Sequence, residues 1–212
     1  ALPTELPSHY FLRLQIYMQK LIIHSSYCLN LLSYFKTFFV HSIFLLGYMG
    51  CGKSTLGRKL SHQLNLPFFD LDHFIEMEEN STVAKLFSSK GEIYFRRLER
   101  NALDRFIASE DAAIVALGGG TPCYFDNMEK LLSSEHRTLY VKANIPTLSA
   151  RLMQEKQTRP LISHLTTQDQ LNEFIGKHLF ERAPYYQQSQ LIVSVDGKSI
   201  EEIVDEITDL LA

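Results

Sequence analysis

The sequence predicts an α/β fold in which a parallel, five-stranded sheet is covered by helices on both faces, giving three layers. Two observations predict this class. Short apolar segments that suit buried parallel strands alternate with longer segments of helical periodicity. In addition, the first apolar segment runs into a glycine-rich loop and then into a helix. Because no internal repeat or low-complexity linker interrupts this pattern, residues 42–212 are predicted to form one domain.

Five apolar segments make up the predicted sheet: SIFLLG (42–47), PFFDLD (67–72), AAIVALGGG (112–120), RTLYVKA (137–143) and QLIVSV (190–195). The predicted helices cover residues 53–64, 92–108, 124–133, 145–156 and 168–182, with a last helix from Ser199. The first of them carries leucines at positions 56, 60 and 64, four residues apart on one face. The last begins with Ser199 and Glu202, which have the spacing of a capping box.

The composition is that of an ordinary globular protein, with 45% hydrophobic and 21% charged residues among 212. A net charge of −3 argues against a nucleic-acid-binding protein, which usually carries a basic excess. The three cysteines, Cys28, Cys51 and Cys123, are isolated, without a CxxC pair or a histidine cluster at metal spacing. This pattern indicates reduced thiols, and we therefore expect a cytoplasmic protein.

The segment 1–41 differs from the rest because it is aromatic, apolar and almost free of acids. Apolar residues recur at helical spacing at Cys28, Leu31, Leu32, Phe35, Phe38 and Phe39. Basic residues interrupt it at Arg13, Lys20 and Lys36, so no run reaches the length of a membrane span, and we expect no membrane contact here. Three readings stay open: an extra helix packed on the domain, a targeting or membrane-surface segment, or a stretch outside the functional fold.

The loop GYMGCGKST (47–55) matches the motif G-x-x-x-x-G-K-[ST], with a predicted strand before it and a helix after it. Glycines let successive backbone N–H groups turn inward around phosphates, and the following helix N-terminus adds partial positive charge. Lys53 can reach the outer phosphates, and the Ser54 hydroxyl can bind Mg²⁺. The alternative is a glycine-rich turn without a ligand. The motif predicts a nucleoside triphosphate site for ATP, but it does not separate a kinase from a GTPase or a mechanical ATPase.

Acidic and basic side chains follow several of the predicted strands. Asp70 and Asp72 lie two apart at the end of the second strand, so both should project from one face. Beside a phosphate site the two carboxylates would repel the nucleotide unless Mg²⁺ or a hydroxyl-bearing substrate lay between the carboxylates and the phosphates. The alternative is that an Asp here simply caps the next helix. In GEIYFRRLE (91–99), Glu92, Arg96 and Glu99 share one helical face, which could equally be a solvated ladder of ion pairs.

Three glycines at the end of the third strand, Gly118, Gly119 and Gly120, indicate close approach of the backbone to a ligand. Farther along the chain, Arg159 lies in a polar stretch between helices, where a lid is expected. Arg182 stands near the end of a later helix, followed by APYY.

In this combination, residues 42–212 resemble the shikimate kinases, small P-loop kinases of the aromatic amino-acid pathway. The matching motifs are GYMGCGKST, DLD, GEIYFRRLE, GGG, the RPL at Arg159 and the ERAPYY at Arg182. A P-loop alone occurs in many families, whereas this set in this order is specific. The resemblance implies the P-loop NTPase-type three-layer fold and transfer of phosphate from ATP to the 3-hydroxyl of shikimate, on the pathway to chorismate. Residues 1–41 have no counterpart in the compact bacterial form.

The resemblance also implies the role of each matching residue. Shikimate would be bound by Asp72, Arg96, Gly118, Gly119, Gly120 and Arg182. The nucleotide would be bound by Gly50, Cys51, Gly52, Lys53, Ser54, Thr55, Arg151, which packs on the adenine, and Arg159, the lid arginine. Glu99 would orient an arginine. The catalytic set would be Lys53, Asp70, Asp72 and Arg159. On hydrogen-bond reach, Asp72 is the better candidate to accept the proton of the attacking hydroxyl, although the two aspartates could share this task. Mg²⁺ would be held by Ser54 and, through water, by Asp70.

Two other functions remain open at this point. One is a related P-loop kinase of another small hydroxy acid, such as gluconate. The other is a nucleotide-binding protein that has lost catalysis, although such relatives usually lack the P-loop lysine or the substrate arginines, which are present here. The expected partners are ATP and shikimate, without nucleic acid, and we expect a monomer.

Overall fold

The structure is a computed structural model that describes residues 41–155, 159 and 161–211. The apolar stripe between Cys28 and Phe39 lies outside the described residues, so its three readings stay untested. Among the described residues, no helix combines the length and the apolar content needed to cross a membrane.

The described chain contains one parallel sheet of five strands, as the sequence predicts. The strands are β1 (Ile43–Leu46), β2 (Phe68–Asp70), β3 (Ile114–Ala116), β4 (Arg137–Lys142) and β5 (Leu191–Ser194). Their order across the sheet is β2-β3-β1-β4-β5, which places β1 at the centre. Ile43 of β1 is in register with Ile114 of β3 on one side and Arg137 of β4 on the other. All four residues of β1 are buried, as its unbroken apolar sequence requires.

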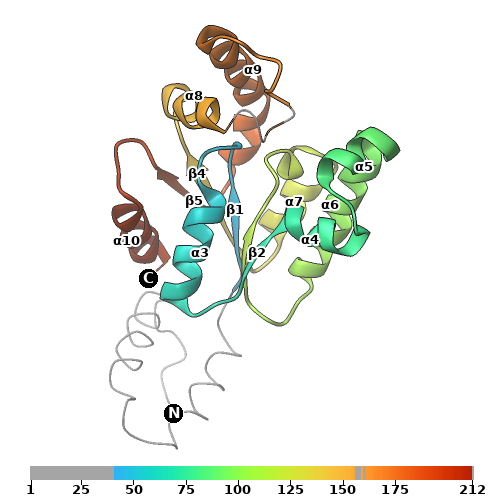
Figure 1. The fold of residues 1–212 in the computed structure, drawn as a ribbon. Coiled ribbons are helices and arrows are strands. Elements are labelled where there is room, and N and C mark those ends of the chain that lie inside the picture. The colour runs from blue at the N-terminus through green and yellow to red at the C-terminus, as the bar shows by residue number, and fades with distance from the viewer. Residues whose placement is uncertain (1–40, 156–158, 160, 212) are drawn as a thin grey trace, which may run out of the picture.

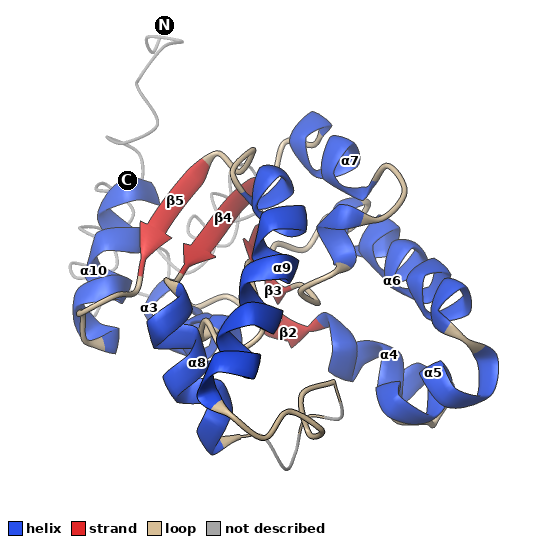
Figure 2. Ribbon diagram, turned by 90° about the horizontal axis from the view of Figure 1, so that it is seen from above, coloured by secondary structure: helices blue, strands red, loops and turns tan. Residues whose placement is uncertain are grey.

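Helices cover the sheet on both sides. They are α3 (Lys53–Leu64), α4 (Leu71–Glu79), α5 (Val83–Lys90), α6 (Glu92–Ile107), α7 (Asn127–Ser133), α8 (Ile145–Gln154), α9 (Gln168–Tyr186) and α10 (Ile200–Leu211). Figure 1 shows α3 and α10 on one side of the sheet and α4 to α7 on the other. Seen from above, α8 and α9 lie across the end of the sheet (Figure 2). This three-layer arrangement confirms the predicted fold class.

Several helix ends follow from local capping. The predicted capping box at the start of α10 is present: the Ser199 hydroxyl accepts from the Glu202 N–H at 3.2 Å, and the Glu202 carboxylate accepts from the Ser199 N–H at 2.7 Å. A second box joins Thr167 and Gln170 at the start of α9. These side chains satisfy N–H groups that the first turn leaves without helical partners.

Four local predictions need correction. Helices α4 and α5 were not predicted, and β2 ends at Asp70 because α4 begins at the next residue. A short 3-10 helix at Thr121–Cys123 precedes α7, which starts at Asn127 and not at residue 124. Helix α9 continues to Tyr186, past residue 182, with Pro184 inside it. A proline so near the end removes one N–H donor, and the helix stops two residues later.

Candidate active site

The glycine-rich loop joins β1 to α3 at the carboxyl end of the sheet (Figure 1). Its backbone needs glycine at Gly47, where φ is 144° and a Cβ would lie 2.6 Å from the Val141 carbonyl oxygen. Gly52, with φ 104°, is the N-cap of α3, and no side chain caps that helix. The N–H groups of the first turn of α3 therefore have no side-chain acceptor, which suits an anion-binding helix terminus.

Two side chains of α3 face the loop and the neighbouring strand. Lys53 Nζ donates to the carbonyl oxygens of Gly47 at 2.7 Å and Tyr48 at 3.1 Å, so the ammonium lies against the loop it follows. The Ser54 hydroxyl donates to Asp70 Oδ2 at 2.7 Å. Ser54 is thus joined to the acid at the end of β2, while Lys53 is held against the loop, and all three side chains line one cavity.

A cavity of about 570 Å³ opens beside this loop. Of the predicted site residues, its lining includes Gly50, Cys51, Gly52, Lys53, Ser54, Thr55, Asp70, Asp72, Gly118, Gly119, Arg151 and Arg159. Arg96, Gly120 and Arg182 are not part of this lining. Gly120 ends the glycine run, and the two arginines lie beside that run. The structure therefore brings the nucleotide side of the predicted site into one cavity, with the remaining substrate residues adjoining it.

Asp70 and Asp72 do not share a strand face, contrary to the prediction. Asp70 is the last residue of β2 and the N-cap position of α4, whereas Asp72 lies in the first turn of α4. Asp70 makes no side-chain cap, so the alternative of a simple helix cap is not what the structure shows. The helical turn still brings both carboxyl groups to the lining of the cavity.

Asp72 is mostly buried, and its Oδ1 atom has no hydrogen-bond partner among the described residues. Burial, followed by the charges of Glu99 and Asp70, raises the pKa of Asp72 to about 7, against the opposing effect of Lys53 and Arg96. An unpartnered carboxyl group with a pKa near neutrality is a group that can take up a proton at physiological pH.

The predicted arginine of α6 is held by acids on its own helix. Arg96 Nη1 donates to Glu99 at 2.6 Å, and Nε and Nη2 donate to Glu92 Oε1 at 3.2 and 3.1 Å. Glu99 is 1% exposed and Arg96 is 8% exposed, so this pair is not a solvated ladder. Only Glu92 reaches the solvent. A buried guanidinium fixed in this way presents a defined edge to a carboxylate.

Gly118 allows two acids and a hydroxyl to converge at the end of β3. A Cβ at this position would lie 2.6 Å from Glu99 Oε1, 2.8 Å from Asp72 Oδ1 and 2.9 Å from Thr121 Oγ1. These distances are shorter than real Cβ contacts, so a larger residue would displace the polar atoms. Gly118 therefore leaves room for the side chains of Asp72, Glu99 and Thr121 to meet. The sequence predicts instead that the backbone here approaches a ligand.

The next two glycines adjoin the two predicted substrate arginines. A Cβ at Gly120 would lie 2.7 Å from Arg96 Nη1, and one at Gly119 would lie 3.7 Å from Arg182 Nη1. Arg182 belongs to α9, and its guanidinium carbon lies 5.9 Å from the centre of the Tyr48 ring. Arg96 and Arg182 thus reach the glycine run from α6 and α9, which are far apart in the sequence.

The two remaining predicted arginines lie at the cavity that opens beside the glycine-rich loop. Arg151 of α8 donates from Nη1 to the carbonyl oxygens of Cys51, at 3.0 Å, and Gly50, at 3.3 Å. Arg159 donates from Nε to Glu155 at 2.9 Å. Both side chains line the cavity, so both can meet a ligand bound by the loop.

Three residues that contact the predicted site residues or the glycine-rich loop were not predicted from the sequence. Thr121 donates a hydrogen bond to Glu99, and the Tyr124 ring lies under the Arg96 guanidinium at 4.2 Å while its hydroxyl donates to Glu92 at 2.7 Å. Both lie within four residues after the glycine run, and that position was the available signal. His178, 3.0 Å from the Tyr48 hydroxyl, has no such sequence signal.

No group of three or more metal-binding side chains occurs in the part of the chain that the structure describes. Beside phosphates, Mg²⁺ needs only one or two oxygen ligands from the protein, because water and the nucleotide supply the others. The hydroxyl of Ser54 and the carboxylate of Asp70 are hard oxygen donors next to the phosphate loop, so the residues present fit Mg²⁺.

Comparison with known proteins identifies the family. The shikimate kinase family model matches residues 49–212. The chain belongs to the shikimate kinase family. A shikimate kinase of Flavobacterium johnsoniae is 46% identical over 168 residues, which cover 79% of this chain and 97% of that protein. One of Bacteroides thetaiotaomicron is 40% identical over 171 residues, covering 79% and 96%.

Solved structures agree with this assignment. The crystal structure of a shikimate kinase from Bacteroides thetaiotaomicron has a TM-score of 0.74 at 40% identity, covering 81% of this chain and 98% of that one. A shikimate kinase from Acinetobacter baumannii in complex with shikimate has a TM-score of 0.73 at 26% identity, covering 84% and 96%. A gluconokinase from Sinorhizobium meliloti reaches 0.52 at 19% identity, which shows a shared fold alone.

Proposed function

We propose that this chain transfers the γ-phosphate of ATP to the 3-hydroxyl of shikimate, giving shikimate 3-phosphate on the pathway to chorismate and the aromatic amino acids. The observation that carries this proposal is the meeting of Asp72, Arg96 and Arg182 around the glycine run, directly beside the phosphate loop. Shikimate has one carboxylate and three hydroxyls on a small ring. Two arginines can bind this carboxylate and an acid can accept hydrogen bonds from the hydroxyls, so these three side chains are complementary to shikimate.

On the substrate side, Arg96 and Arg182 bind the carboxylate, and Asp72 accepts hydrogen bonds from ring hydroxyls. Arginine suits this task because its planar guanidinium can bind a carboxylate in a bidentate manner. Glu99, buried at 1% exposure, holds Arg96 in place through its 2.6 Å bond. Gly118, Gly119 and Gly120 leave room for these groups and for the ring.

On the nucleotide side, the backbone of the loop and the N-terminus of α3 bind the phosphates of ATP. Lys53 exchanges its two carbonyl partners for phosphate oxygens, and Arg159 adds positive charge where negative charge develops. Arg151 lies along the loop and packs on the adenine. Phosphoryl transfer needs alignment and charge stabilisation more than covalent help, and these residues supply both.

Mg²⁺ would be held by Ser54 directly and by Asp70 through water. When bound, the ion neutralises phosphate charge and orients the β- and γ-phosphates. Asp70 and Ser54 are already joined at 2.7 Å, so the two donors need little rearrangement to share an ion.

Asp72 is the group that takes the proton from the attacking hydroxyl. Its Oδ1 atom is unpartnered and its pKa is raised to about 7, mainly by burial, so its basicity is matched to a proton transfer near neutral pH. Asp70 is a weaker candidate because its carboxylate already accepts the Ser54 hydrogen bond.

Residues 42–212 form the kinase domain in this proposal, and the enzyme acts as a cytoplasmic monomer. The cytoplasm is supported by Cys51 and Cys123, which are free thiols in the described part of the chain. A silent nucleotide-binding role is not favoured, because Lys53, Asp72 and both substrate arginines are present at the site.

The test is a coupled assay of ADP release with shikimate and with gluconate as acceptors, on the full chain and on a chain that begins at Ser42. We expect turnover with shikimate, none with gluconate, and equal kinetics for the two chains. The Lys53→Met variant serves as the inactive control. Turnover with gluconate alone, or ATP binding without turnover on either acceptor, would refute the proposal.

A further inference from the structure

A contact between the phosphate loop and α9 is not explained by ATP or shikimate binding. Tyr48 is the second residue of the loop, and its side chain is 1% exposed. The Tyr48 hydroxyl lies 3.0 Å from Nδ1 of His178 on α9, with the two rings edge to face at 6.1 Å. His178 is neither part of the family motifs quoted above nor a residue that lines the cavity.

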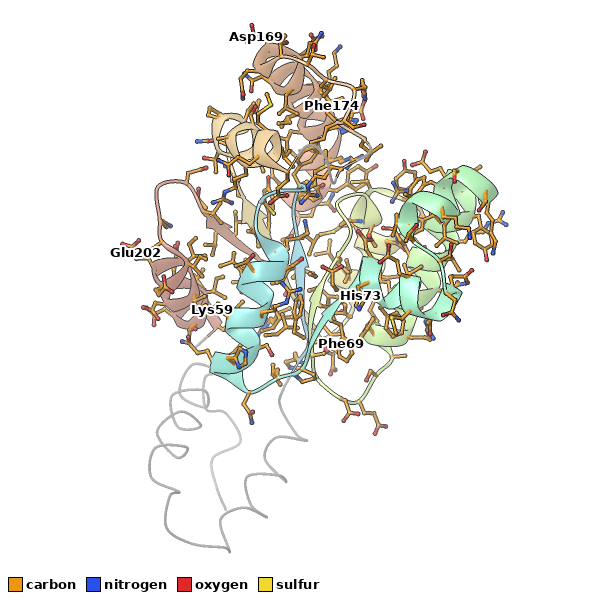
Figure 3. All side chains as sticks on the ribbon, viewed as in Figure 1. Lys59, Phe69, His73, Asp169, Phe174 and Glu202 are labelled. Carbon is orange, nitrogen blue, oxygen red and sulfur yellow. The ribbon has the colours of Figure 1, made fainter. Side chains whose placement is uncertain are left out.

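The position of His178 on α9 connects this contact to Arg182. Residues four apart on an α-helix share a face, so Phe174, His178, Arg182 and Tyr186 form one stripe along α9. Figure 3 shows Phe174 on this helix, and its ring packs against His178 at 4.2 Å. One turn after His178 comes Arg182, the proposed substrate arginine.

Two anchors therefore flank Arg182. On one side, His178 is joined to Tyr48 of the phosphate loop. On the other, Tyr186 donates a hydrogen bond to the carbonyl oxygen of Gly119 in the glycine run. The Arg182 guanidinium lies between them, over the Tyr48 ring at 5.9 Å, within the range of a cation–π contact.

The charges around His178 favour a neutral ring in this contact. Partial burial, and then the positive charge of Arg182, lower the pKa of His178, while Glu181 opposes them. Burial also raises the pKa of the Tyr48 hydroxyl, so the phenol keeps its proton. A neutral imidazole and a phenol form a hydrogen bond in either tautomer of the histidine.

The same tyrosine is connected to the nucleotide side, because its backbone carbonyl accepts a hydrogen bond from Lys53 at 3.1 Å. Tyr48 thus touches the phosphate-binding lysine through its backbone and the substrate arginine through its ring. We propose that the Tyr48–His178 hydrogen bond positions Arg182 against the phosphate loop, so that it sets the affinity for the carboxylate of the acceptor. His178 and Tyr48 are positioning residues, which act through Arg182.

This inference rests on the proposed function, and its test separates the two. The variants are Tyr48→Phe, which keeps the ring and removes the hydroxyl, and His178→Leu, which removes the ring nitrogen. His178→Asn is the conservative variant, since its amide can stand near the position of Nδ1. Tyr185→Phe, on the same helix and 37% exposed, is the matched control. Steady-state ADP release is measured on the full chain with each substrate varied in turn.

We expect Tyr48→Phe and His178→Leu to raise KM for shikimate about tenfold, the size of one lost hydrogen bond, with KM for ATP and kcat changed by less than about twofold. His178→Asn should recover most of the loss, and Tyr185→Phe should match the unaltered enzyme. A residue that serves packing alone is not expected to raise KM for shikimate without raising KM for ATP. It is also not expected to regain its function when asparagine replaces histidine.

Different failures have different consequences. If the unaltered chain releases no ADP with shikimate, the proposed function falls and this inference with it. If the unaltered chain is active but Tyr48→Phe matches Tyr185→Phe, the inference alone is overturned. It is equally overturned if KM for ATP rises as much as KM for shikimate, or if His178→Asn is as impaired as His178→Leu.

Discussion

The raised pKa of Asp72 predicts that this residue destabilises the protein without ligands at the pH where it works. The substitution Asp72→Asn keeps the shape and removes the ionisable group. In the folded protein, burial and then the charges of Glu99 and Asp70 raise the pKa from 3.8 to about 7. The folded state therefore holds a proton that the unfolded state has lost across that interval. Stability gained from this group is complete below pH 3.8 and is lost as the pH rises through 7.

The size of the effect follows from the shift. The rise in the pKa of Asp72 from 3.8 to about 7 corresponds to an upper limit of about 4 kcal/mol in the free energy of unfolding, at ~1.4 kcal/mol per pKa unit. At about half that limit, asparagine would raise the melting temperature by roughly 4–8 °C above pH 7, given ~2–4 °C per kcal/mol for a chain of this size. Near pH 4 the difference should be small, because Asp72 is then neutral in the folded protein and only partly ionised in the unfolded one.

The assay is thermal unfolding of both proteins, without ligands, at pH values from 4 to 8. The exposed acid Asp111 provides the control, because Asp111→Asn makes the same chemical change at the surface, away from the cavity. The melting difference for Asp72→Asn should grow between pH 4 and 7 and then level off, while turnover with shikimate is lost. A difference that stays constant over this range would refute the raised pKa and, with it, the assignment of Asp72 as the base.

Three further outcomes are expected. Arg96→Lys keeps a positive charge beside Glu99 but loses the planar guanidinium that binds a carboxylate with two hydrogen bonds. In steady-state assays it should raise KM for shikimate at least about tenfold and leave KM for ATP nearly unchanged. An equal rise in both KM values would contradict the assignment of Arg96 to the substrate carboxylate. Lys53→Met should lower kcat by at least about a hundredfold, while calorimetric titration still shows shikimate binding. Gly118→Ala should lower kcat/KM by about a hundredfold, because a Cβ 2.8 Å from Asp72 Oδ1 must displace the carboxylate that acts as the base. Activity close to that of the unaltered enzyme would contradict this prediction, since it would show that the polar atoms can move aside.

The sequence was sufficient to predict the sheet and the phosphate loop because both leave strong local patterns. A buried parallel strand such as β1 must be apolar throughout, and a phosphate loop requires glycines at fixed spacing. The edge strand β2 was harder, because only Phe68–Asp70 pair with β3 and the apolar pattern continues without a break into α4. The alternation of DLD resembles a strand, but Leu71 is fully buried as the first residue of a helix.

The partners of the predicted residues could not be read from spacing. Glu92, Arg96 and Glu99 have the same spacing in a solvated ladder as in this buried network. What separates the two is the packing of Tyr124 and Thr121 against them, which depends on the turn after β3. Contacts across 130 positions, such as that of Tyr48 with His178, leave no local pattern at all.

The site combines one acid that is fully paired with one that is not, and this difference follows from what each must do. Glu99 accepts a hydrogen bond on each of its two oxygens, from Arg96 and from Thr121, so it orients the arginine and has no oxygen left free to react. Asp72 lies close enough to Glu99 for the two charges to repel, yet its Oδ1 atom is left without a partner among the described residues. A hydrogen-bond donor supplied by the protein would lower the pKa of Asp72 and stabilise the fold, but it would also occupy the lone pair that must meet a substrate hydroxyl. Because Gly118 brings both acids to one point without filling the space between them, the donor that completes this cluster is left to come from the substrate.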